Sequence, residues 1–122
     1  MTSAPGLVRG LADERLAVVL KAMYAQPEYS WTVSKMAEQV ALSRSAFYAR
    51  FNKTVGVPPM QYLLFWRMAL AKQMLTEQKM TVEQTAGRVG YGSSSAFSVA
   101  FTRYIGVSPS HYVAAGLSAV SQ

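Results

Sequence analysis

The chain has 122 residues and a net charge of +6, and 51% of its residues are hydrophobic. Such a length and composition fit one compact domain, or two very small ones, and exclude a disordered polypeptide. The chain has no cysteine, which excludes disulfides and thiolate metal sites. No apolar run approaches the roughly 18 residues of a membrane span, and no signal-peptide pattern opens the chain. We therefore expect a soluble, cytoplasmic protein with no membrane contact.

The first half of the chain is predicted to begin with an unstructured segment and to continue with three helices. Residues 1–11 are small and rich in Gly and Pro, which predicts a linker or disordered N-terminus. Residues 12–57 are predicted to form a first subdomain. It holds an amphipathic helix that ends before Pro27, a helix over 33–40 with Thr32 as its N-cap, and a helix over 44–55. Ser43 is the predicted cap of the third helix, and Gly56 ends it.

The second half begins with a long helix. Residues 58–76 are predicted to form a linker helix, with Pro59 in its first turn. Residues 77–115 form a second subdomain with helices over 82–89 and 94–105, capped by Thr81 and Ser93, and a short final helix from Pro109. Residues 116–122 are predicted to be a C-terminal tail. Because no segment alternates with a period of two, the fold class is predicted to be all-α.

The two subdomains repeat one another. The stretch SAFYARF, which begins at Ser45, recurs fifty positions later as SAFSVAF, and GVPPMQY, which begins at Gly56, recurs fifty positions later as GVSPSHY. Upstream, TVSKMAEQV returns forty-nine positions later as TVEQTAGRV. Each copy therefore places a short helix, a tight turn and a second helix in order, which is the helix-turn-helix arrangement that inserts its second helix into the DNA major groove. A linker helix could hold two such recognition helices about one DNA turn, roughly 34–36 Å, apart.

The charge distribution also favours a polyanionic partner. No acidic residue lies between Glu38 and Glu77 or after Glu83. The basic residues of these two windows are Arg44, Arg50, Lys53, Arg67, Lys72, Arg88 and Arg103. Such asymmetry is typical of nucleic-acid binding, and a basic surface that is merely solvated is the alternative.

The repeated segments resemble a known family. LSRSAFYARF, GVPPMQYLLFWRMALAKQML, TVEQTAGRVGYGSSSAFSVAF and GVSPSHY are similar to the bipartite DNA-binding domain of AraC/XylS transcription regulators over about Asp13 to Tyr112. The resemblance implies seven helices, two homeodomain-like helix-turn-helix subdomains and a long linker helix. It also implies sequence-specific binding of double-stranded DNA by two recognition helices in successive major grooves. The family's N-terminal effector or dimerisation domain is expected to be missing from this chain.

The period of each recognition helix predicts which side chains face DNA. Phe47 and Phe51 point inward in the first helix, as Phe97 and Phe101 do in the second. The positions that the resemblance assigns to base edges are Arg44, Ser45, Tyr48, Ala49 and Asn52 in the first helix, and Ser94, Ser95, Ser98, Val99 and Thr102 in the second. Family members often carry Arg at the positions of Ala49 and Val99, and Glu or Gln at that of Ser94. The second helix therefore offers mainly small hydroxyl groups.

A second group of residues is predicted to contact phosphates. It comprises the caps Ser43 and Ser93, whose helices direct backbone amides outward, and the basic residues Arg50, Lys53, Arg67 and Arg103. Several alternatives stay open. Arg44 suits guanine or phosphate equally, Tyr48 could be half-buried packing, and Arg67 could stabilise a neighbouring helix end.

Catalysis is not expected. His111 is the only histidine, and with no cysteine or nearby carboxylate it cannot form a metal cluster or a catalytic triad. GYGSSS, which begins at Gly90, lacks the lysine of a phosphate-binding loop. We expect no cofactor and no metal. The rival hypothesis is a helical protein-interaction module that docks on a transcription partner such as RNA polymerase.

Overall fold

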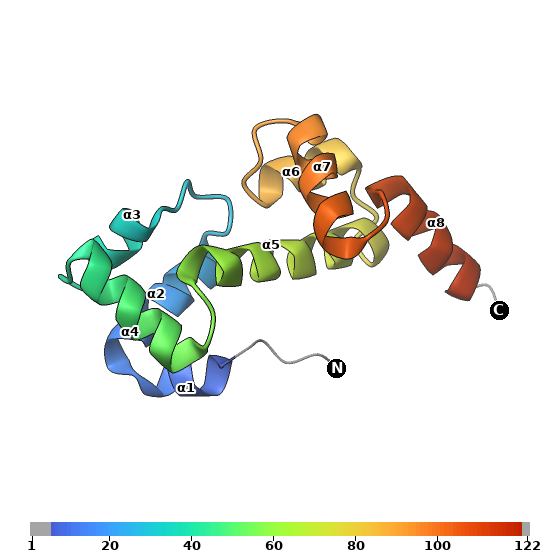
Figure 1. Ribbon diagram of the computed structural model, residues 1–122. Helices are drawn as coiled ribbons and strands as arrows, with labels where there is room; N and C mark the ends of the chain where they lie inside the picture. Colours follow the sequence, from blue (N-terminus) through green and yellow to red (C-terminus); the bar gives the residue numbers. More distant parts are fainter. Residues whose placement is uncertain (1–5, 121–122) are drawn as a thin grey trace. The chain divides into compact units, whose positions relative to one another are not determined.

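The computed structural model describes residues 6–120, and side chains as far as residue 116. Every regular element in that range is a helix, which confirms the all-α prediction. The helices are α1 (Leu7–Ala12), α2 (Glu14–Ala25), α3 (Val33–Glu38), α4 (Arg44–Val55), α5 (Pro59–Thr76), α6 (Val82–Arg88), α7 (Ser94–Ile105) and α8 (Pro109–Val120) (Figure 1). The chain divides into two compact units, and the boundary between them falls within α5, between Trp66 and Arg67.

The described chain has eight helices rather than the seven that the sequence predicted, because residues 7–12 form α1. This segment was predicted to be a linker or disordered; residues 1–5 of that prediction lie outside the described residues. Packing stabilises α1. Gly10 is buried, and its Cα lies so near the side chains of Leu20 and Val55 that an added Cβ would meet them at 2.8 and 3.2 Å. Nε of Arg9 donates a hydrogen bond of 2.8 Å to the carbonyl of Thr54, at the end of α4.

Most helix boundaries agree with the prediction, and the differences lie at C-termini. The predicted caps are observed: Thr32, Ser43, Thr81 and Ser93 each accept a backbone N–H through the side chain. Helices α3 and α6 end at Glu38 and Arg88, where the backbone bends into the turn before the next helix. The last helix is longer than predicted, because α8 continues to Val120 through most of the expected tail.

The two units use the same aromatic arrangement in their cores. In the first, the rings of Phe47 and Phe51 lie 5.7 Å apart, and Tyr62 meets Phe51 edge-on at 6.0 Å. In the second, Phe97 and Phe101 lie 5.6 Å apart, and Tyr112 meets Phe101 edge-on at 5.6 Å. All four phenylalanines are fully buried. This confirms the inward face that the sequence period predicted and makes each helix-turn-helix a separately packed structure.

The turns inside the two helix-turn-helix segments share one backbone conformation but not one residue type. In the second unit Gly90 has φ 91°, and Tyr91 N–H donates to the carbonyl of Ala86 at 2.8 Å. In the first unit Ala41 occupies the same place with φ 54°, and Leu42 N–H donates to the carbonyl of Ala37 at 3.2 Å. Since a left-handed conformation costs a residue with a Cβ about 1–2 kcal/mol, Ala41 is strained where Gly90 is not.

We expect Gly90→Ala to lower the free energy of unfolding by about 1 kcal/mol. This is the strain of the left-handed conformation less the stabilisation that alanine brings by reducing the conformational entropy of the unfolded chain. Ala41→Gly should leave the stability unchanged or raise it by up to about 1 kcal/mol. Urea denaturation followed by far-UV circular dichroism measures both. Gly87→Ala is the matched control: Gly87 lies in α6 with no atom within 4 Å of an added Cβ, and the substitution should stabilise. If Gly90→Ala stabilised the protein as Gly87→Ala does, the strain argument would be wrong.

Candidate nucleic-acid interface

The first helix-turn-helix consists of α3 and α4, which pack against each other in the first unit (Figure 1). Helix α4 begins where Ser43 Oγ accepts the amide of Ala46 at 3.2 Å, and its buried stripe is Phe47, Phe51 and Val55. The predicted outward side chains of α4 are all exposed, namely Arg44, Ser45, Tyr48, Ala49 and Asn52. Because Tyr48 is 40% exposed, it is accessible to a ligand.

The second helix-turn-helix consists of α6 and α7 in the second unit. Ser93 Oγ accepts the amide of Ala96 at 3.1 Å, which repeats the cap of α4. Among the predicted outward side chains, Ser95, Val99 and Thr102 are exposed, whereas Ser94 and Ser98 are half-buried. Val99 is the most exposed large hydrophobic residue of α7, at 61% exposure.

A hollow of about 570 Å³ opens beside the outer face of α7. Its walls come from the start of α6, the start of α7 and the start of α8. The hydroxyl-bearing residues among them are Thr81, Ser94, Ser95, Ser98, Ser108 and Ser110, and Glu83 is the one charged residue of the lining. Hydroxyl groups both donate and accept hydrogen bonds, so this surface can bind polar atoms without selecting one chemical pattern. The corresponding face of α4 carries Arg, Tyr and Asn side chains instead.

The four basic residues predicted to contact phosphates occupy different environments. Lys53 and Arg103 are exposed, near the ends of α4 and α7. Arg67 is half-buried in the second unit, and burial lowers the pKa of its guanidinium while the neighbouring Tyr91 acts in the opposite direction. That position agrees better with the alternative in which Arg67 stabilises the unit internally.

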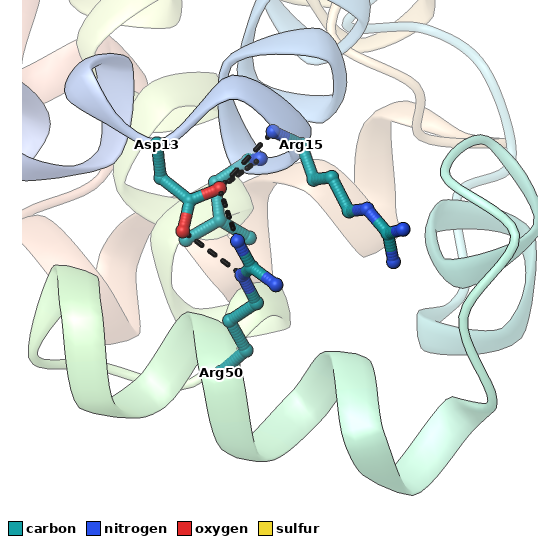
Figure 2. Close-up of polar contacts among 4 residues, drawn as sticks. Asp13, Arg15 and Arg50 are labelled. Atoms are coloured by element: carbon teal, nitrogen blue, oxygen red, sulfur yellow. Dashed lines mark hydrogen bonds and ion pairs between the residues drawn. The ribbon is translucent and has the colours of Figure 1, made fainter.

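Arg50 is the fourth of these basic residues, and it is bound to a carboxylate. Figure 2 shows its guanidinium against Asp13, with Nε 2.9 Å from Oδ2 and Nη2 3.1 Å from Oδ1. The same carboxylate caps α2 by accepting the amides of Arg15 at 3.0 Å and Leu16 at 3.1 Å. The hydrogen bond from Arg50 is the main cause that lowers the pKa of Asp13 below its usual value. The phosphate role of Arg50 stays a prediction, and Asp13 is a residue that the sequence reasoning did not select.

The described residues contain no group of three or more His, Cys, Asp or Glu side chains arranged to hold a metal ion. Within the same range, no helix combines the length and the apolar character needed to cross a bilayer.

Comparisons with known proteins agree with this geometry. A family model described as a helix-turn-helix domain matches residues 36–115, a range that begins inside α3 and includes α4, α6 and α7. A protein of Streptomyces lividans, provisionally named an AraC-like transcription regulator, is 46% identical over 107 residues, or 88% of this chain and 35% of the relative. The HTH-type transcriptional regulator AlkR of Acinetobacter baylyi is 41% identical over 102 residues, which cover 84% of this chain and 33% of AlkR. The chain thus spans about a third of the length of these relatives.

A solved structure is similar over nearly its whole length. It is the DNA-binding domain of AdpA, a global transcriptional factor, in complex with a target DNA. The match has a TM-score of 0.81 and 32% identity, and it covers 90% of this chain and 98% of the AdpA domain. Together with the family model, these likenesses extend over both units and both repeated helix pairs. The chain therefore belongs to the AraC/XylS family of transcription regulators and corresponds to the helix-turn-helix domain of that family.

Proposed function

We propose that this chain binds double-stranded DNA sequence-specifically, as the DNA-binding domain of an AraC-like transcription regulator. The observation that carries the proposal is the repeated helix-turn-helix, in which α4 and α7 bury equivalent phenylalanines and expose the opposite face. Neither helix carries an acidic side chain, and Glu83 of α6 is the one acidic residue that lines the hollow beside α7. The similarity to the AdpA domain, which was solved with its target DNA, supports the same conclusion.

Each recognition helix is proposed to enter one major groove, and the two grooves are proposed to be successive. In α4, Arg44 can donate two hydrogen bonds to guanine O6 and N7, and Asn52 can pair bidentately with adenine. Tyr48 offers a single hydroxyl, while Ser45 and Ala49 allow close approach to the base edges. In α7, Ser94, Ser95, Ser98 and Thr102 offer hydroxyls, and Val99 can contact a thymine methyl group.

Contacts to the sugar–phosphate backbone are proposed to fix the register of each helix on the duplex. The caps Ser43 and Ser93 use their hydroxyls within the protein, so their contribution is to expose the free amides of the first helical turn. Lys53 and Arg103 supply exposed positive charge. Arg67 is half-buried and Arg50 is bound to Asp13, so we assign them smaller contributions.

The unequal faces of α4 and α7 lead to a test by selection of bound sequences from a random duplex library. Bidentate contacts discriminate between bases by about 1–3 kcal/mol each, whereas single hydroxyls accept either a donor or an acceptor. The selected motif should therefore carry most of its information in the half-site under α4. The half-site under α7 should be degenerate and read mainly through DNA shape. Equal information in both halves, or all of it under α7, would contradict the assignment of the outward faces.

Two variants sharpen this test. Arg44→Ala should relax the preference at one or two bases of the informative half-site. Arg103→Ala is the control, since a phosphate contact carries no sequence information and its loss should weaken all duplexes about equally.

The full-length protein is proposed to contain more than this domain. The curated relatives are about three times as long as the matched segment, which fits an additional effector-binding or dimerisation domain. A contact with RNA polymerase is proposed as part of regulation by the full-length protein, and it does not require a surface on this chain.

A further inference from the structure

The corner between α1 and α2 contacts the recognition helix α4 at two polar points and one apolar point. Arg9 Nε binds the carbonyl of Thr54, in the last turn of α4. One turn earlier, Arg50 binds Asp13 through two hydrogen bonds (Figure 2). The apolar contact is that of buried Gly10, next to Arg9, which lies against Val55 at the end of α4. These contacts join α4 to a segment that lies outside the helix-turn-helix.

We infer that Asp13 is a positioning residue for base recognition: through Arg50 it fixes the rotation of α4, and it thereby withdraws Arg50 from contact with phosphate. This inference rests on the proposed function, because it names a residue that determines how α4 meets DNA. It assigns Arg50 a role different from the phosphate contact that the sequence suggested.

The geometry of the ion pair supports a positioning role. The carboxylate of Asp13 is fixed from one side by the amides of Arg15 and Leu16, so it cannot rotate without uncapping α2. From the other side, the planar guanidinium of Arg50 meets both oxygens, a bidentate arrangement that specifies orientation as well as distance. The side chain of Asp13 is only 15% exposed, against 44% for Arg50. A rigid anchor on α2 therefore binds a side chain of α4 that solvent can still reach.

The position of Arg50 on α4 explains why its ion pair with Asp13 affects base recognition. Arg50 directly follows Ala49 and precedes Asn52 by two positions, so a rotation of α4 that displaces Arg50 also displaces the outward face. Hydrogen bonds to base edges require correct placement to a fraction of an ångström, so a recognition helix that reads bases gains from such a fixed orientation.

The second unit has no equivalent of this ion pair. Fifty positions after Arg50 the repeat carries Ala100, which has no polar group in its side chain. The ion pair thus occurs in the unit whose outward face holds Arg44, Tyr48 and Asn52, and not in the unit that offers hydroxyls. This is the distribution expected if Asp13 and Arg50 serve base discrimination rather than general affinity.

The test compares Asp13→Ser, Arg50→Ala and the double variant with the parent domain. Serine caps a helix about as well as aspartate, so Asp13→Ser removes the ion pair while it preserves the start of α2. Affinity is measured for the duplex selected from the random library and for duplexes with one substitution in the half-site under α4, over a range of salt concentrations. Lys53→Ala is the matched control, because Lys53 is an exposed basic residue of α4 in the same turn as the Arg9 contact.

We expect Asp13→Ser and Arg50→Ala to reduce discrimination between the matched and substituted duplexes by roughly tenfold, about the contribution of one bidentate base contact. Arg50→Ala should keep the salt dependence of the parent, whereas Asp13→Ser releases Arg50 toward phosphate and should not lower the salt slope. The double variant should discriminate no worse than either single variant. Lys53→Ala should do the opposite: its slope of log affinity against log salt should fall by about 0.9, with discrimination intact.

Two results would overturn the inference. The first is that Arg50→Ala lowers the salt slope by about 0.9, as the loss of a phosphate contact in the parent domain would. The second is that both variants discriminate as the parent does. A parent domain that binds no duplex in a salt-dependent manner would instead refute the proposed function itself, and with it this inference.

Discussion

Replacing Phe47 or Phe97 by Ala is expected to lower the free energy of unfolding by about 3–5 kcal/mol, because each ring is fully buried and its removal leaves a cavity that neighbouring residues fill only in part. The two residues are the equivalent anchors of the two helix-turn-helix segments. Each ring contacts a second phenylalanine one turn later, Phe51 or Phe101. The loss should therefore be similar in both copies.

The two tryptophans allow the effects on the units to be measured separately. Trp31 and Trp66 both belong to the first unit, so their fluorescence reports its unfolding, whereas far-UV circular dichroism reports both units. Phe47→Ala should shift the fluorescence transition to lower urea. Phe97→Ala should shift the dichroism transition, and its effect on fluorescence measures how strongly the units are coupled.

Tyr48→Ala is the matched control for Phe47→Ala. Tyr48 is the adjacent aromatic residue on α4, but it is 40% exposed, so its removal should change the free energy of unfolding far less. A Phe47→Ala variant as stable as the parent would show that the inward and outward faces of α4 are assigned wrongly.

The features that the sequence predicted well are those that depend on neighbours within about one helical turn. Ser43 and Ser93 were predicted as caps, and their hydroxyls bind amides three residues later. The buried stripe of Phe47 and Phe51 follows from a spacing of four. The repeat strengthened these predictions, because the same cap and the same phenylalanine spacing occur in both helix-turn-helix segments.

Helix α1 was missed because its stability comes from packing. It has six residues and contains Gly10, too short and too flexible a segment for a helical period to be visible. The same glycine permits the close approach to Leu20 and Val55 that stabilises the helix. A residue type that locally disfavours a helix is here required by the tertiary contact.

The ion pair between Asp13 and Arg50 was missed for a related reason. The two residues are 37 positions apart, and nothing in the local sequence of either one indicates the other. The small number of acidic residues was itself a signal, because an Asp before one helix and an Arg on another helix can form an ion pair. Without the packing of α1 and α2 on α4, that signal could not be distinguished from a cap and a free phosphate ligand.

DNA affinity is expected to fall roughly 10³–10⁵-fold between 50 and 200 mM salt if about 6–10 phosphates are neutralised, because each neutralised phosphate releases condensed counterions. The structure favours the lower part of that range, since Arg50 is bound to Asp13 and Arg67 is half-buried. The measurement is fluorescence anisotropy with a short labelled duplex at several salt concentrations. Lys21→Ala is the control: Lys21 is exposed on α2, outside both helix-turn-helix segments, so its removal should leave the slope unchanged, whereas Arg103→Ala should lower it by about 0.9. An affinity almost independent of salt would contradict DNA binding and favour the interaction module, because apolar and shape-driven contacts between proteins release few counterions.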